Sequence, residues 1–199
     1  MKKRSFYKWL KKRIKHQYHS LRELYAIESS NSNVHIENGV QIINSKNLRL
    51  GKNIYICRGS VLHCGGEAWC NFQGGISIGD YTYIAPNCVL FGAGEIEIGA
   101  QCNFGPGVQI MSQSLHKDLR NDDVLLDKVV PPHMFAKVTL GKGVLVGTGS
   151  IILAGVTIGD GAVISAGSVI QKDIPKNSVV ITGRKIKVID KQSPLFRPR

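Results

Sequence analysis

The residues best suited to chemistry lie in the polar stretch GVQIMSQSLHKDLRNDD, in which His116 follows Ser112 and Ser114. A neutral imidazole can accept a proton from a hydroxyl group near pH 7. A serine hydroxyl or a backbone N–H can stabilise the oxyanion that develops when a carbonyl group is attacked. No second histidine stands close to His116 in the sequence. These residue types would allow His116 to act as a general base and Ser112, Ser114 or a backbone N–H to donate to an oxyanion; an ordinary exposed loop histidine is the alternative.

The chain on either side of this stretch repeats every six residues. After it, the apolar positions of the repeat are Leu140, Val146, Ile152, Ile158, Ile164 and Ile170. A buried helical face recurs every three or four residues, so a period of six indicates three strand alternations and then a turn. A glycine often follows the apolar residue, as at Gly141, Gly147 and Gly159, and we expect it to supply the backbone angles of a corner. A chain that turns every six residues forms a coil.

The repeat covers most of residues 34–175. Shorter runs of it begin at Leu50, Ile78 and Ile98. Such an extent is typical of a solenoid, whose units must stack to bury one core, whereas the hairpins of a β-sandwich do not keep one phase over six turns. The repeat is interrupted at residues 63–75, 91–97 and 111–139. Because loops project side chains that a regular coil buries, chemistry is expected in the longest interruption, which contains His116.

Composition limits the class of protein. The chain has 199 residues, of which 43% are hydrophobic and 22 are glycine, and this predicts one soluble domain with tails, without a membrane span or a cleavable signal peptide. The five cysteines are odd in number and have no close pairing, so we expect reduced thiols in the cytosol. His63, Cys64 and Cys70 lack a fourth ligand, and no metal is expected.

The segment VTIGDGAVISAGSVIQKDIPKNSVVITG, together with the six-residue repeat, resembles the hexapeptide-repeat acyltransferases over residues 34–189. It is most similar to the branch of maltose, galactoside and nodulation-factor O-acetyltransferases. The resemblance implies an all-β fold, a left-handed parallel β-helix of about five or six coils. We divide the chain into a basic amphipathic helix at 1–30, which rests on composition, the β-helix at 31–189 with an extruded catalytic loop at 111–139, and a tail at 190–199. Leu145 and the segment 183–187 depart from the pattern of many relatives.

The resemblance implies acetyl transfer from acetyl-CoA to a carbohydrate hydroxyl within a homotrimer, with His116 as the base. It sets Asn87 and Glu95 against the acceptor. Asn87 could equally be a corner residue, since asparagine tolerates left-handed angles, and a structural role is favoured for Glu95. Glu67 and Trp69 could flank a sugar ring or simply cap the edge of the prism.

The resemblance also implies the donor site. The pantetheine arm of acetyl-CoA would run beside Thr148 and Ala166 in the groove between two copies. The CoA phosphates would pass Lys172, Arg184 and Lys185, whose cationic side chains suit phosphate contacts. A solvated corner is the alternative for Lys172.

Three other functions are weighed against this one. The first is N-acylation of an amino sugar or nucleotide sugar, and the second is a non-catalytic β-helix scaffold. The third is a γ-class carbonic anhydrase, which needs three zinc-binding histidines; His63, His116 and His133 do not form the expected close pair.

The N-terminal segment has its own composition. Residues 1–26 hold nine lysines and arginines against one glutamate, and apolar residues recur there at helical spacing beside Trp9. This predicts a basic amphipathic helix on an anionic membrane, which would locate a cytoplasmic protein at the inner face of the membrane beside lipid-linked precursors of a surface polysaccharide. Nucleic-acid binding, which is not expected, and a helix that caps the prism are the alternatives.

Overall fold

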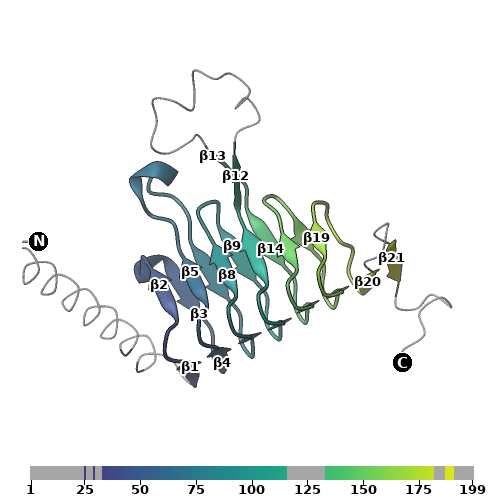
Figure 1. Ribbon diagram of the computed structural model, residues 1–199, viewed down its shortest axis with the longest axis horizontal. Coiled ribbons are helices and arrows are strands. Elements are labelled where there is room, and N and C mark those ends of the chain that lie inside the picture. The colour runs from purple at the N-terminus through teal and green to yellow at the C-terminus, as the bar shows by residue number, and fades with distance from the viewer. Residues whose placement is uncertain (1–24, 26–28, 30–32, 116–132, 182–186, 191–199) are drawn as a thin grey trace, which may run out of the picture.

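The computed structural model describes residues 25, 29, 33–115, 133–181 and 187–190. The six-residue repeats form a parallel β-helix with three sheets, one on each side of a coil that the chain winds six times (Figure 1). The all-β parallel β-helix predicted from the repeat is confirmed. The predicted N-terminal helix lies outside the described residues, except that Tyr25 and Ser29 are helical.

The strands of each sheet follow one another along the prism. The first sheet holds β1 (Val34–Ile36), β4 (Ile54–Ile56), β7 (Tyr83–Ile84), β10 (Asn103–Phe104), β15 (Leu145–Val146), β18 (Val163–Ile164), β20 (Ser178–Ile181) and the antiparallel β21 (Lys187–Asp190). The second sheet holds β2 (Gln41–Ile43), β5 (Val61–His63), β8 (Val89–Phe91), β11 (Gln109–Met111), β16 (Ile151–Ile152) and β19 (Val169–Ile170). The third sheet holds β3 (Leu48–Leu50), β6 (Ile76–Ile78), β9 (Ile96–Ile98), β14 (Val138–Leu140) and β17 (Thr157–Ile158).

Two further strands stand away from the coils. They are β12 (Gln113–Leu115) and β13 (His133–Phe135), which pair antiparallel at the root of the longest interruption (Figure 1). Two short 3₁₀-helices are η1 (Ser45–Asn47) and η2 (Ala68–Cys70). We call the turn from the first to the second sheet the first corner, and the turn from the second to the third sheet the second corner.

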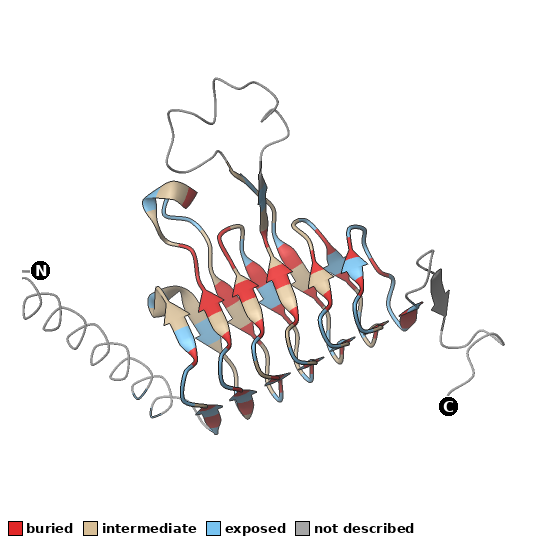
Figure 2. Cartoon of the chain, viewed as in Figure 1, coloured by how far each residue is buried: buried red, intermediate tan, exposed pale blue. Residues whose placement is uncertain are grey.

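The apolar residues of the hexads form one buried core enclosed by the three sheets. Figure 2 shows buried positions, in red, recurring along the stacked strands. In the middle of the first sheet, Phe104 is aligned with Ile84 and Val146 of the neighbouring coils and is completely buried. Parallel pairing in register brings every sixth residue onto the same column, so one repeat builds one continuous core.

The glycine after the apolar residue is required for a reason other than the one predicted. A Cβ atom added to Gly147 would lie 2.4 Å from the backbone nitrogen of Ala166 in the next coil. The left-handed angle occurs two residues later, where Gly149 has a φ of 66°. The first glycine therefore lets two coils approach each other, and the second supplies the corner angle.

All five cysteines are buried free thiols, as the sequence predicts. Burial raises the pKa of the Cys64 thiol to about 12 and that of Cys88 to about 11. These two groups stay protonated near neutral pH and do not serve as nucleophiles. Within the described ranges, no three histidine, cysteine or acidic side chains are arranged to hold a metal ion. The helical residues that the structure describes include no segment long and apolar enough to cross a membrane.

Candidate active site

The chain leaves the prism at Ser112, on the second corner. The Ser112 hydroxyl donates to the carbonyl oxygen of Phe91 at 2.8 Å and accepts the backbone N–H of Gly94 at 2.8 Å. The side chain is completely buried. Its hydroxyl is thus already bonded to the preceding coil, and the prediction that Ser112 donates to an oxyanion is wrong. Ser114, on β12, is exposed.

The returning end of the loop is fastened to the same place. The backbone N–H of Ala136 donates to the Ser112 carbonyl at 3.0 Å, and the N–H of Val138 donates to the Glu95 carbonyl at 3.1 Å. A Cβ atom at Gly94 would lie 2.1 Å from the Ser112 oxygen, so only glycine permits this approach. Both ends of the loop are therefore clamped onto the interruption at residues 91–97.

The ribbon of β12 and β13 holds the residue before His116. Leu115, the last residue of β12, is paired with His133 at the start of β13. His116 lies outside the described residues, so its role as the base stays a prediction. Although no histidine is close to His116 in sequence, the antiparallel pairing brings His133 opposite the residue before it. Eighteen positions separate Leu115 from His133 along the chain, and the pairing of β12 with β13 brings them opposite each other.

Aromatic rings gather beside this ribbon. We call them the aromatic cluster, and its members are His63, Trp69, Phe91, His133 and Phe135. Trp69 lies at the centre, with ring centroids 5.3 Å from His133 and 6.0 Å from Phe135. His63 stacks on Phe91 at 4.5 Å, because the two residues are paired in register in the second sheet. The sequence missed this cluster because its members come from three separate interruptions.

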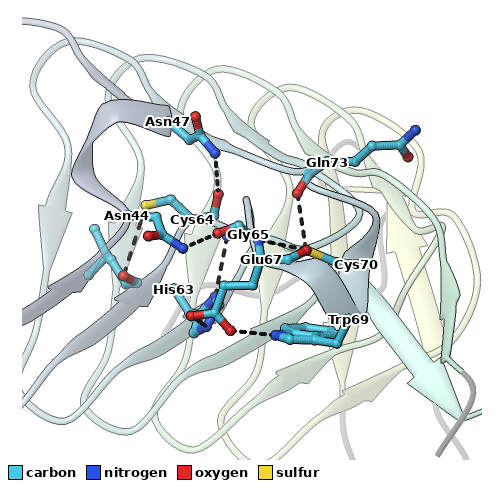
Figure 3. Close-up of polar contacts among 10 residues, drawn as sticks. Asn44, Asn47, His63, Cys64, Gly65, Glu67, Trp69, Cys70 and Gln73 are labelled. Atoms are coloured by element: carbon cyan, nitrogen blue, oxygen red, sulfur yellow. Dashed lines mark hydrogen bonds and ion pairs between the residues drawn. The ribbon is translucent and has the colours of Figure 1, made fainter. Parts of the chain in front are cut away.

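The interruption that carries Trp69 is rigidly built. Two of its four glycines, Gly65 and Gly66, have φ values of 64° and 76°, in the left-handed region that favours glycine. The side-chain amides of Asn44 and Asn47 donate to the carbonyls of Gly65 and Cys64, respectively (Figure 3). These bonds from the preceding coil hold the start of the loop in one conformation.

Glu67 orients the indole of Trp69. The Trp69 Nε1–H donates to Glu67 Oε2 at 2.6 Å, and His63 Nε2 lies 3.8 Å from Glu67 Oε1 (Figure 3). The backbone N–H of Gly65 donates to His63 Nδ1 at 3.3 Å, so the ring proton of a neutral His63 is on Nε2, facing Glu67. Glu67 and Trp69 are thus joined by a hydrogen bond, and the suggestion that they flank a sugar ring stays a prediction.

Glu95 lies at the second corner, close to the root of the loop. Its side chain is exposed and its carboxylate lies 4.0 Å from Lys137 Nζ. Lys137 also contacts Glu97 at 2.6 Å, and the hydrogen bond to that carboxylate raises the pKa of Lys137. The three residues line a groove of ≈ 280 Å³ that also contains Lys46 and Arg49.

Three other predicted site residues share the first corner. Thr148 and Ala166 are both exposed and occupy equivalent places in successive coils, where Thr148 O accepts the N–H of Gly167 at 2.8 Å. Asn87 lies on the same corner with a φ of 61°, and a Cβ atom at Gly59 would lie 2.2 Å from its Oδ1. Asn87 therefore forms the corner, which is one of the two roles considered for it; the acceptor role stays a prediction.

Three predicted site residues remain: one lies on the second corner and two lie outside the described part of the chain. Lys172 is exposed at the second corner, two coils beyond the loop. Arg184 and Lys185 lie outside the described residues. One chain thus carries predicted site residues on two corners, which are separated by a three-residue strand of about 10 Å.

Comparison with known proteins supports the interpretation of the repeat. Residues 137–172 match the family described as "Bacterial transferase hexapeptide (six repeats)". Nodulation protein L of Rhizobium meliloti (strain 1021) is 39% identical over 112 residues, which are 56% of this chain and 58% of that protein. Residues 137–172 thus carry the six-residue repeat of that transferase family, and the chain is similar to nodulation protein L over the matched part. It spans less than two thirds of the length of that relative.

Solved structures of acyltransferases share the fold. AntD, an N-acyltransferase from Bacillus cereus in complex with dTDP and 3-hydroxybutyryl-CoA, has a TM-score of 0.67 at 24% identity, covering 80% of each chain. A maltose O-acetyltransferase from Clostridium difficile 630 has a TM-score of 0.51 at 26% identity, covering 79% of this chain and 70% of that one. Hexapeptide-repeat proteins of this shape thus include both O- and N-acyltransferases.

Proposed function

We propose that the chain is an acetyl-CoA-dependent O-acetyltransferase that modifies a hydroxyl of a sugar or a surface-polysaccharide precursor. The observation that carries the proposal is the extruded ribbon. Ser112 and Glu95 clamp its two ends to the prism, and β12 ends at Leu115, the residue directly before His116 in the sequence. A rigid base for the loop is what a positioned general base requires.

His116 acts on the acceptor hydroxyl in this mechanism. As the hydroxyl oxygen attacks the thioester carbon, the imidazole accepts its proton, and an oxyanion forms on the carbonyl oxygen. A backbone N–H or the Ser114 hydroxyl stabilises that charge. Collapse of the intermediate forms the ester C–O bond and breaks the C–S bond, and the proton passes from the imidazole to the leaving CoA sulfur. The thioester is reactive enough that no covalent enzyme intermediate is needed.

In this proposal the pantetheine arm of acetyl-CoA lies along the first corner, beside Thr148 and Ala166. The CoA phosphates meet Lys172, which is on the second corner, together with Arg184 and Lys185. The loop belongs to the second corner, about 10 Å away across the second sheet. A homotrimer of left-handed prisms would bring the first corner of one copy to the second corner of the next, and this completes a walled site.

N-acylation of an amino sugar is a second candidate. It is favoured by the likeness of the fold to the Bacillus cereus N-acyltransferase, whose structure holds dTDP and 3-hydroxybutyryl-CoA. An amine attacks a thioester more readily than a hydroxyl does, so an N-acyltransferase depends less on a base before the attack.

Replacement of His116 tests the proposal. We expect His116→Ala to lower kcat at least about a hundredfold and to leave acetyl-CoA binding unchanged, as removal of a general base does. His35→Ala, at an exposed site in β1, is the matched control and should retain full activity. Assays with hydroxyl and amine acceptors side by side decide between O- and N-transfer. Full activity of His116→Ala on a hydroxyl acceptor contradicts the proposal, and no transfer by the wild type to any acceptor favours a scaffold.

The basic segment at residues 1–26 completes the proposal. It would bind the anionic inner face of the cytoplasmic membrane through its basic and aromatic sides. This location would bring the site close to lipid-linked sugar precursors.

A further inference from the structure

The aromatic cluster does more than anchor the loop, because its rings are partly exposed to solvent. Trp69, Phe91 and Phe135 are each only partly buried, although Trp69 lies within 6.2 Å of both phenylalanines. Rings that served only to anchor a loop would gain most by complete burial. The exposed indole instead offers a flat apolar surface at the root of the ribbon.

Two polar atoms on the ribbon lack partners. Among the described side chains, the buried nitrogen and oxygen atoms without a hydrogen-bond partner are Gln113 Oε1 and His133 Nδ1. Gln113 is paired with Phe135, and Leu115 with His133, so alternation puts these side chains on one face of the ribbon. It is the face whose rings contact Trp69. Buried polar atoms are normally paired, and two unpaired ones on one face indicate where polar groups of a ligand enter.

A carboxylate completes this surface. The Glu67 side chain is fixed by the Trp69 indole and His63, yet it is 43% exposed, so part of its accepting capacity faces solvent. The ring contacts and ion pairs described for the cluster involve no lysine or arginine. A carboxylate without a cation disfavours phosphate and favours hydroxyl donors.

We propose that the aromatic cluster and Glu67 form a binding subsite for a pyranose ring. The C–H face of the sugar stacks on the solvent side of the Trp69 indole, and its hydroxyls donate to Glu67 Oε1. The bonds that Asn44 and Asn47 make to the loop keep the indole in place before the sugar arrives, which lowers the entropic cost of binding. The identification of this sugar as the acyl acceptor rests on the proposed function. The binding of a sugar at this surface does not depend on it.

Binding of simple sugars to the full-length chain tests the subsite. Trp9 and Trp69 are the two tryptophans, so Trp9→Phe leaves Trp69 as the reporter. We expect titration with methyl glucoside, galactoside, mannoside and N-acetylglucosaminide to give a saturable change in fluorescence for at least one sugar. Saturation-transfer NMR then measures the same sugar on the variants. Trp69→Ala should weaken binding at least about tenfold, the equivalent of one lost stacking contact.

Two further variants keep the test independent of folding. Glu67→Gln retains an oxygen that accepts the Trp69 Nε1–H but loses the charge, and it should weaken binding severalfold. Phe72→Asn is the matched control: Phe72 is on the same loop, is 73% exposed and has a φ of 57°, which asparagine tolerates. This control should bind as the wild type does.

The outcomes separate the subsite from the enzyme function. The subsite is overturned if the wild type binds none of the four sugars. It is also overturned if Trp69→Ala and Glu67→Gln both bind the sugar as tightly as the wild type does. If Trp69→Ala raises the KM of a transferred sugar and leaves kcat nearly unchanged, both proposals stand. Sugar binding that depends on Trp69 without any acyl transfer keeps the subsite and removes the proposed function. If His116→Ala lowers kcat but Trp69→Ala leaves KM unchanged, the proposed function is kept and the subsite is removed.

Discussion

Replacement of Ser112 by alanine distinguishes a structural anchor from a catalytic group. The hydroxyl bonds the Phe91 carbonyl and the Gly94 N–H at 2.8 Å each, in a fully buried position. The Phe91 carbonyl keeps a second bond, from the Ser112 backbone N–H at 3.0 Å, after the substitution. The Gly94 N–H loses the acceptor that the structure gives it.

The expected cost follows from that loss. One enclosed N–H without an acceptor costs about 1–3 kcal/mol, so we expect Ser112→Ala to lower the free energy of unfolding by about that amount. Activity should stay within about threefold at a temperature well below the unfolding transition. A side chain that donates to an oxyanion would instead cost about 10²–10³ in kcat.

Urea unfolding measured by circular dichroism gives the stability, and hydrogen exchange of the Gly94 amide reports the local bond. Ser60→Ala is the matched control, because the buried Ser60 hydroxyl donates to the Ala85 carbonyl and accepts the Cys88 N–H at the first corner. Ser60→Ala should cost similar stability without faster exchange at Gly94. A large fall in kcat of Ser112→Ala with unchanged stability would refute the anchoring role.

Three other predictions concern the core, a thiol and the N-terminal segment. Phe104→Ala should lower the free energy of unfolding in urea by about 3–5 kcal/mol, because it leaves a cavity in the central coils. Leu145→Ala, at a 45% exposed site, should lower it far less, and equal losses would contradict the packing. Burial raises the pKa of the Cys64 thiol from 9.0 to about 12. Its contribution to stability should therefore be complete below pH 9 and be lost as the pH rises towards 12. Unfolding measured as a function of pH should show a smaller loss for Cys64→Ser than for the wild type. Deletion of residues 2–20 should abolish sedimentation with anionic vesicles and leave transfer to a soluble acceptor intact; unchanged sedimentation, or unfolding of the prism, would exclude the membrane role.

The six-residue period predicted most of the fold because each coil repeats one local rule. Phe104 and Ile110 are six residues apart and both are completely buried, as the period requires. The breaks in the period located the loops for the same reason. The role of Gly147 was predicted wrongly, because the close approach of Ala166 in the next coil is a contact between coils that no local pattern contains.

The candidate site was only partly predictable. The position of His116 in a long loop and the pairing of Glu67 with Trp69 are local features. The contact of Trp69 with His133 joins residues 64 positions apart and depends on how the loops at residues 63–75 and 111–139 stack. Periodicity says where such loops leave the coil but not which side chains meet outside it.

The irregular segments all lie on one corner, and this arrangement ties them together. The extra residues of the first four coils fall between the second and third sheets, while the first corner keeps a constant length, as at residues 57–60 and 85–88. Each insertion bonds the next: Asn47 holds the Cys64 carbonyl, and the Gly94 N–H is held by Ser112. Because parallel register stacks the insertions of successive coils directly on one another, hydrogen bonds and ring contacts run without a break from Asn47 through the aromatic cluster to the ribbon that precedes His116. We therefore expect substitutions along this edge to alter the site more than they alter the hexads that form the core.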